Sequence, residues 1–372
     1  MSTNQRLLSL DVFRGLTIAG MILVNNSGDW NNIYPPLRHA EWNGCTPTDL
    51  VFPFFLFIVG ISIALALSKR KERGDDQKTI LLKILRRTLI IFGIGVFLNG
   101  FPLFDLSTIR IPGVLQRIAL VYGISAVLFL KTNWKTQAIV GVGLLFLYWG
   151  LMTLIPTPDG YAPNLEPGTN LGAWLDRALL SGHLWGQAKT WDPEGLLSTL
   201  PAITTGISGI LTGLWIKSKQ DNYKKLVGLF GFGVILVTLG LVWDLAFPIN
   251  KKIWTSSFVL YTGGIALLTL AMVYWLVDVL GYKKWTKPFV IYGMNALFVY
   301  VLSGLVAKAL YYIKWQNDSG DTTTLGSWIY KSFFEPVFSN PMNSSLAYAV
   351  FNVLFFLGIS WILYRRKIFI KV

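Results

Sequence analysis

Ten apolar runs, most of them close to twenty residues long, account for more than half of the sequence. They lie at about 9–26, 46–68, 83–100, 113–130, 136–155, 196–216, 225–246, 254–281, 288–311 and 343–364. About 20 apolar residues make a helix long enough to cross the hydrocarbon core of a bilayer, and these runs lack the alternation of a membrane-spanning strand. The sequence therefore predicts an all-α integral membrane protein with about ten transmembrane helices.

Composition excludes other classes of protein. Only 14% of the 372 residues are charged and 53% are hydrophobic, whereas a soluble domain has about 25% charged residues. A soluble enzyme and a disordered chain are therefore excluded. The single cysteine, Cys45, cannot build a disulfide framework. The N-terminal segment has no signal-peptide cleavage site, and we expect residues 1–372 to form a single transmembrane domain.

Basic residues gather on one side when successive loops are assigned to alternate faces of the membrane. The side that holds both termini carries 23 Lys and Arg against 6 Asp and Glu, while the other side carries 10 and 13. Net charges of +17 and −3 fit the positive-inside rule. We therefore expect cytoplasmic termini. The net charge of +14 is explained by basic residues on the cytoplasmic side of a lipid bilayer. The bilayer is therefore the expected partner, and no nucleic acid is expected.

Two long loops, about 156–195 and 312–342, are expected on the outer side. Each contains a short amphipathic segment behind a predicted N-cap, with Asn170 before LGAWLDRALL and Thr324 before LGSWIYKSFF. The two helices either lie on the membrane surface or against the spans, or they cover an outward-facing cavity. The pattern alone leaves both interpretations open.

The outer loop after the first span gathers polar groups around one of the two histidines. His39 follows Asn25, which ends the first span, and precedes Asn43 and Asp49, which opens the second. Such a histidine is either a solvated surface residue or a general base, because imidazole exchanges protons near neutral pH. We regard this loop as a candidate catalytic site.

Ionisable and polar residues inside the other spans need partners or a polar cavity. Asp11 and Arg14 form either a local ion pair or a phosphate contact. Arg117 lies one turn inside a span and needs either an acidic partner or a polar cavity. The candidates for that partner are Asp49, Asp105, Glu194 and Asp244.

Three further segments have local interpretations. WDPEG resembles a helix start, with Glu194 in the first turn. The glycines after it, Gly206 and Gly209, favour close helix packing. Asp244 and Asn295 lie in apolar runs, where Asn295 is explained by an interhelical hydrogen bond.

Familiar motifs for nucleotide hydrolysis and metal catalysis are missing from the sequence. It has no P-loop, CxxC, HExxH or GxSxG. Two histidines and one cysteine do not make a usual zinc site. We expect no metal.

Six motifs, in order along nearly the whole chain, resemble the heparan-α-glucosaminide N-acetyltransferase family. They are RLLSLDVFRG, VN…HAEWNG…DLVFPFFLFIVG, IRIPGVLQRIALVY, LDR…HLW…WDPEGLLSTL, FPINKKIW and YGMNALFVYV. The resemblance implies a transmembrane acetyltransferase that takes acetyl-CoA as co-substrate from the cytosol and acetylates a terminal glucosamine amine on the far side. It also implies a homodimer. We expect a bacterial inner-membrane form without the extra luminal domain of the lysosomal enzyme.

The resemblance also implies roles for individual residues. The catalytic histidine of the family maps onto His39, and the asparagine of its VN pair maps onto Asn25, which would bind the acetyl carbonyl or the histidine. His39 either takes the proton of the amine or carries the acetyl group transiently. On charge and position, the residues expected at the CoA phosphates are Arg14, Asp11, Lys83, Arg86 and Arg87. The residues expected to support the site or bind the acceptor are Asp49, Asn43, Arg117, Glu194, Asp244 and Asn295.

Other functions remain open on the sequence. NNSGDW replaces a glycine run of the family's relative, so the acceptor cannot be carried over from the resemblance. An O-acyltransferase of an envelope glycan needs only a hydroxyl in place of the amine. A sugar or acyl-carrier transporter, or a non-catalytic protein that binds CoA or lipid, also has use for intramembrane polar residues.

Overall fold

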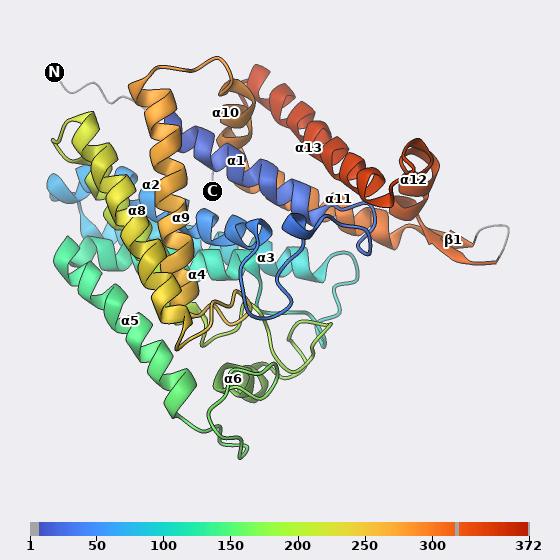
Figure 1. The fold of residues 1–372 in the computed structure, drawn as a ribbon, viewed down its shortest axis with the longest axis horizontal. Helices are drawn as coiled ribbons and strands as arrows, with labels where there is room; N and C mark the ends of the chain where they lie inside the picture. Colours follow the sequence, from blue (N-terminus) through green and yellow to red (C-terminus); the bar gives the residue numbers. More distant parts are fainter. Residues whose placement is uncertain (1–6, 317–319, 371–372) are drawn as a thin grey trace.

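A computed structural model describes residues 7–316 and 320–370 (Figure 1). Arg6, counted above on the predicted cytoplasmic side, lies outside the described residues, as do the last two residues of the tail. The α-helices are α1 (Leu8–Asn25), α2 (Val51–Glu72), α3 (Gln77–Gly100), α4 (Val114–Lys131), α5 (Trp134–Leu154), α6 (Leu171–Leu180), α7 (Thr199–Lys217), α8 (Asn222–Asp244), α9 (Ser256–Tyr274), α10 (Lys287–Met294), α11 (Ala296–Tyr312), α12 (Leu325–Phe333) and α13 (Pro341–Arg365). The shorter elements are η1 (Pro35–Leu37), η2 (Pro47–Leu50), η3 (Trp275–Val279, a π-helix that continues α9), η4 (Glu335–Val337), β1 (Lys314–Gln316) and β2 (Thr322–Thr324).

Within the described residues, eight helices are long and apolar enough to cross a membrane, and the number rises to nine if the bent pair α10 and α11 counts as one span. The chain is thus a mostly helical, multi-pass membrane protein. The expected number of about ten is close, and the difference arises at α3.

The third expected span is a helix, but its first half is charged. α3 contains Lys78, Lys83, Arg86 and Arg87 in its first three turns. The apolar remainder, 88–100, rises only about 20 Å at 1.5 Å per residue, which is shorter than the roughly 30 Å hydrocarbon core. α3 therefore does not meet the length and composition of a full span.

The ninth expected span, 288–311, is not one straight helix. It breaks at Asn295, and its two halves, α10 and α11, meet at 80°. The Asn295 amide leaves the helix pattern and binds the C-terminal tail instead. Its Nδ2 donates to the Ile368 carbonyl at 3.1 Å, and its Oδ1 accepts from the Ile370 N–H at 2.8 Å. The expectation of an interhelical hydrogen bond was therefore wrong, because the partner of Asn295 is the tail.

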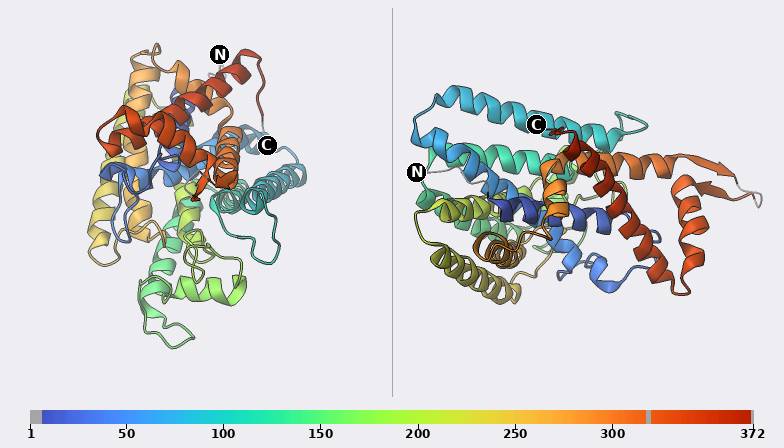
Figure 2. Two further views of the ribbon diagram at one scale, coloured as in Figure 1. Left: turned by 90° about the vertical axis from the view of Figure 1, so that its right-hand side faces the viewer. Right: turned by 90° about the horizontal axis from the view of Figure 1, so that it is seen from above.

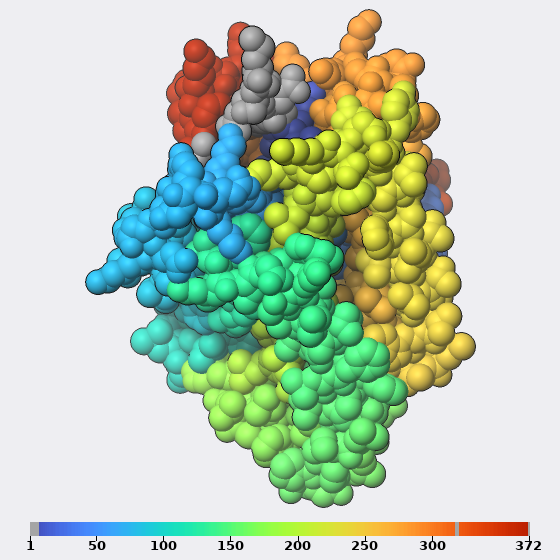
Figure 3. Space-filling model, turned by 90° about the vertical axis from the view of Figure 1, so that its left-hand side faces the viewer, coloured from blue at the N-terminus to red at the C-terminus, as the bar shows by residue number. Residues whose placement is uncertain are grey.

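Contacts pair α8 with α9, α2 with α7, α1 with α10 and α3 with α4. β1 and β2 form an antiparallel hairpin that projects to one side with α12 (Figure 2). On another face, α5 in green and α8 in yellow lie at the surface (Figure 3). Their outward side chains are apolar, as with Val227 and Ile139, which suits a surface covered by lipid.

Glycines allow the closest approach between α2 and α7. A Cβ on Gly60 would lie 2.0 Å from the Gly206 carbonyl oxygen, and one on Gly209 would lie 2.0 Å from the Phe57 carbonyl oxygen. Real Cβ atoms cannot sit that close, so both positions require glycine. This confirms the prediction of close packing at Gly206 and Gly209.

The two short amphipathic helices have the predicted N-caps. The Asn170 side chain accepts from the Ala173 N–H, and the Thr324 side chain accepts from the Ser327 N–H.

Candidate functional site

His39 lies in the loop between α1 and α2, and its ring is held by Asp49. His39 Nδ1 is 2.6 Å from Asp49 Oδ1. Asp49 belongs to η2, where its other oxygen accepts from the Ala40 and Thr46 N–H groups and from the Thr46 hydroxyl. Both oxygens of the buried carboxylate are thereby occupied. With Nδ1–H donating to Asp49, Nε2 of a neutral His39 keeps its lone pair for chemistry.

Lys251, from the loop between α8 and α9, also reaches His39. Its Nζ is 3.0 Å from His39 Nδ1 and 3.4 Å from Asp49 Oδ1. When Nδ1 carries a proton, the ion pair with Asp49 is the attractive part of this arrangement, because two donors face each other at the ring nitrogen. Burial lowers the pKa of Lys251, and the Asp49 charge opposes that shift.

A set of polar contacts docks the Lys251 loop onto the His39 loop. Asn250 Nδ2 donates to Asn43 Oδ1 at 3.1 Å, and the Gly44 N–H donates to the Ile249 carbonyl at 2.6 Å. Asn43 therefore supports the site by joining two loops that are about 200 residues apart in the chain.

A cavity of about 180 Å³ connects the predicted catalytic residues. Its polar lining comprises Asn25, His39, Thr48, Glu194, Lys251 and Tyr300. Its apolar lining includes Val51 and Phe52 of α2 and Leu115 and Ile118 of α4. Pockets for whole drug-sized ligands measure roughly 300–1,000 Å³, so this space suits a small reacting group with the end of its carrier. No described lining residue comes from α6 or α12, and these helices contact α5 and α11 instead, which favours packing against the spans over a cover for this cavity.

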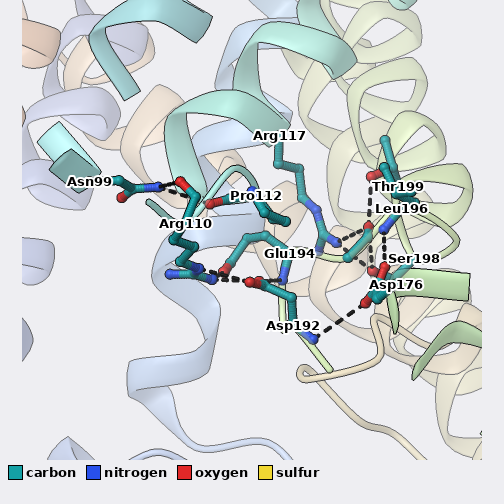
Figure 4. Close-up of polar contacts among 11 residues, drawn as sticks. Asn99, Arg110, Pro112, Arg117, Asp176, Asp192, Glu194, Leu196, Ser198 and Thr199 are labelled. Atoms are coloured by element: carbon teal, nitrogen blue, oxygen red, sulfur yellow. Dashed lines mark hydrogen bonds and ion pairs between the residues drawn. The ribbon is translucent and has the colours of Figure 1, made fainter. Parts of the chain in front are cut away.

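Arg110 holds Glu194 at the edge of this cavity (Figure 4). Its guanidinium binds Asp192 twice, at 2.8 Å from Nε and 2.5 Å from Nη2, and Nη2 also lies 2.5 Å from Glu194 Oε2. Burial lowers the pKa of Arg110, but the two carboxylates outweigh it and raise that pKa above its usual range. The arginine is therefore a permanent cation that fixes Glu194.

This network corrects the expected helix start at WDPEG. α7 begins at Thr199, so Glu194 is not in its first turn. The segment before α7 folds as a turn, because its backbone N–H groups donate to a side chain of α6 and not to carbonyl groups within a helix. Asp176 of α6 accepts from the Asp192 and Leu196 N–H groups, and burial raises the pKa of Asp176 to about 6.

Arg117 is fully buried behind Glu194, but its hydrogen bonds go to neutral groups. It donates to the Gly195 carbonyl at 3.0 Å and to the Ser198 hydroxyl, and it lies over the Trp254 ring at 5.2 Å. Among the described residues, Arg117 has no ion pair with a carboxylate, although Glu194, one of the predicted candidates, lies close enough for its charge to act on Arg117. The nearby carboxylates bind Arg110, a residue that was not singled out in the sequence.

The residues expected at the CoA phosphates lie away from this cavity. Arg14 Nη1 is 3.2 Å from Asp11 Oδ1, as predicted for a local pair, and Nη2 donates to Ser62 of α2. Lys83, Arg86 and Arg87 are exposed on α3, where Arg87 lies 4.7 Å from the centre of the Tyr122 ring.

Two further predicted residues have local structural partners. Asp244 Oδ1 accepts from the Ile249 N–H at 2.6 Å, which closes the turn after α8. Asn295 binds the tail as described above. Neither residue is among the described residues that line the cavity.

Arg110 and Tyr300 were missed in the sequence, and Lys251 was not assigned to the site. Arg110 and Lys251 stand within the motifs IRIPG and FPINKK, so a signal was present. Burial raises the pKa of Cys45 to about 12, which makes this neighbouring thiol a poor nucleophile. In the described part of the chain, no cluster of three or more His, Cys, Asp or Glu residues is arranged to bind a metal.

Comparisons with known proteins agree on one family. Residues 6–165, which contain Asn25, His39 and Asp49, match the family model described as heparan-alpha-glucosaminide N-acetyltransferase, catalytic. The human protein of that name is 30% identical over 68% of this chain and 46% of its own length. The mouse protein is 31% identical over 69% and 47%. The chain thus spans about half the length of the curated relatives it matches.

Proposed function

Because the chain belongs to the heparan-α-glucosaminide N-acetyltransferase family, we propose that it moves an acetyl group from cytosolic acetyl-CoA to an amino sugar on the periplasmic side of a bacterial inner membrane. The observation that carries this proposal is the shared cavity of Asn25 and His39, with the His39 ring oriented by Asp49.

The chemistry follows from what these side chains can donate and accept. A protonated amine cannot attack a thioester, so His39 Nε2 first removes a proton from the amine. The nitrogen then forms the C–N bond to the acetyl carbon and releases a second proton to water, the C–S bond breaks, and the thiol of CoA leaves with the proton returned by His39. In an alternative order, Nε2 itself accepts the acetyl group before the amine does.

Asn25 and Lys251 are placed to stabilise charge during the transfer. Both line the cavity with His39. The Asn25 amide is a hydrogen-bond donor for the acetyl carbonyl oxygen, on which negative charge develops. The Lys251 ammonium adds a positive field in a partly desolvated site, where such a charge acts more strongly than in water.

The cavity volume of about 180 Å³ supports entry of the acyl end of the donor alone. We propose that the nucleotide end stays at the cytoplasmic face, near Arg14 with its partner Asp11 and near the α3 residues Lys83, Arg86 and Arg87. Guanidinium and ammonium groups suit phosphate recognition there. We also propose that the protein forms a homodimer, as the family resemblance implies.

The deciding experiment measures transfer from radiolabelled acetyl-CoA to glucosamine by the purified protein, with His39→Ala as the variant. We expect wild-type transfer and at least a hundredfold loss in the variant, since a general base supplies about 10²–10⁴-fold, while acetyl-CoA still binds. His183→Ala is the matched control, because the Nδ1 of that second histidine lies 2.9 Å from the Ile109 carbonyl oxygen, away from the cavity lining.

Other outcomes would separate the alternatives. Transfer that survives in His39→Ala removes this histidine from the mechanism. Transfer to a hydroxyl sugar but not to glucosamine supports the O-acyltransferase. Uptake of sugar without acetylation supports the transporter.

A further inference from the structure

Glu194 is the carboxylate among the described residues that line the His39 cavity. Its Oε2 accepts from Arg110, whereas Oε1 has no hydrogen-bond partner among the described residues. The side chain is 11% exposed, so the open oxygen belongs to a largely enclosed group. A charged oxygen in such a group gains from a hydrogen-bond donor, and Glu194 lines the cavity in which an acceptor molecule could supply one.

The other carboxylates nearby are already occupied. Both carboxylate oxygens of Asp49 already have hydrogen-bond partners, which are His39, Ala40 and Thr46. Asp192 is fully buried and accepts from Arg110 with both oxygens. Glu194 is therefore the acidic group with a free acceptor site toward the cavity.

The neighbouring cations do not use this free oxygen. Arg110 is bound on one side by Asp192, Lys251 pairs with Asp49, and Arg117 donates to Gly195 and Ser198. Arg110 fixes the orientation of Glu194 by a charge-assisted hydrogen bond at 2.5 Å.

We propose that Glu194 binds the protonated amine of the acceptor and thereby selects amines over hydroxyls. This inference rests on the proposed acetyl transfer. One N–H of the ammonium bonds to Glu194 Oε1, and His39 Nε2 removes another proton, which leaves a neutral amine able to attack the thioester. A hydroxyl acceptor carries no charge and gains little from the carboxylate.

The test compares two nucleophiles in wild type and Glu194→Gln, a change that keeps the size of the side chain. Glucosamine is the charged acceptor, and hydroxylamine is a nucleophile that is mostly uncharged at neutral pH. We expect KM for glucosamine to rise about tenfold to a hundredfold, the range for loss of a hydrogen bond to a charged group. We expect kcat/KM for hydroxylamine and the affinity for acetyl-CoA to stay within about threefold of wild type.

Glu166→Gln is the matched control, because Glu166 is exposed in the outer loop and does not line the cavity. If Glu194→Gln does not bind acetyl-CoA, Glu194→Asp replaces it, since the shorter carboxylate keeps its charge beside Arg110 and should still weaken glucosamine selectively. Equal losses for both nucleophiles, or no loss, would overturn the role of Glu194. Failure of the wild-type protein to acetylate either nucleophile would instead overturn the proposed function.

Discussion

At the residue scale, the site depends on how Asp49 holds the His39 ring. The 2.6 Å contact between Asp49 Oδ1 and His39 Nδ1 fixes which nitrogen faces the cavity. An asparagine can present its NH₂ group to Nδ1, which favours the wrong tautomer and puts the proton on Nε2. The Asp49 carboxylate therefore sets the tautomer of the His39 ring as well as its orientation.

We expect Asp49→Asn to lower kcat by about 10²–10⁴-fold, as for loss of a general base, with acetyl-CoA affinity unchanged. Steady-state kinetics with glucosamine and a binding assay for acetyl-CoA measure the two quantities. Asp159→Asn is the control, since Asp159 pairs with Arg177 in the outer loop. An Asp49→Asn protein with wild-type kcat would show that the tautomer of His39 does not matter.

The sequence predicted which polar residues line the cavity better than it predicted their partners. His39, Asn25 and Glu194 were singled out because polar groups in or beside apolar runs are unusual. Lys251 was not placed with them, because 212 residues separate it from His39 and only the fold brings the two loops together. Arg110 was not predicted to bind the carboxylates, since residue spacing does not reveal which guanidinium faces them.

At the element scale, the packing of α2 on α7 leaves no room for a side chain at its glycines. A Cβ on Gly209 would meet the Phe57 carbonyl oxygen at 2.0 Å, and this backbone atom cannot turn aside as a flexible side chain could. We expect Gly209→Ala to lower the free energy of unfolding by about 1–3 kcal/mol or more, the usual range for overpacking.

Thermal unfolding in detergent measures this effect. Gly143→Ala in α5 is the matched control, because a Cβ there meets nothing within 4 Å and alanine favours a helix over glycine by about 1 kcal/mol. An unchanged melting temperature for Gly209→Ala would mean that the two helices separate easily.

The sequence predicted nearly all helices but not the bend between α10 and α11. Apolar residues continue through Asn295, so hydropathy indicates one helix over 288–311. The bend depends on hydrogen bonds from Asn295 to Ile368 and Ile370, about 70 residues further on. A long-range partner of this kind leaves no trace in local periodicity.

At the scale of the whole molecule, transfer across a membrane requires the His39 cavity and the CoA pool to lie on opposite sides. The charge asymmetry of +17 against −3 predicts this orientation, with the His39 loop and loop 156–195 outside. The connection between α7 and α8, which contains Lys219, should then face the cytoplasm.

Cysteine labelling tests the orientation directly. In a Cys45→Ser background, a membrane-impermeant maleimide should label Glu166→Cys in intact spheroplasts and should label Lys219→Cys only after lysis. Both positions are exposed in the structure, so protection reports the membrane rather than burial. The reverse pattern would place His39 on the same side as cytosolic acetyl-CoA. The proposed chemistry would then remain possible, but the acetyl group would not have to cross the bilayer, and the acceptor would have to be sought in the cytoplasm.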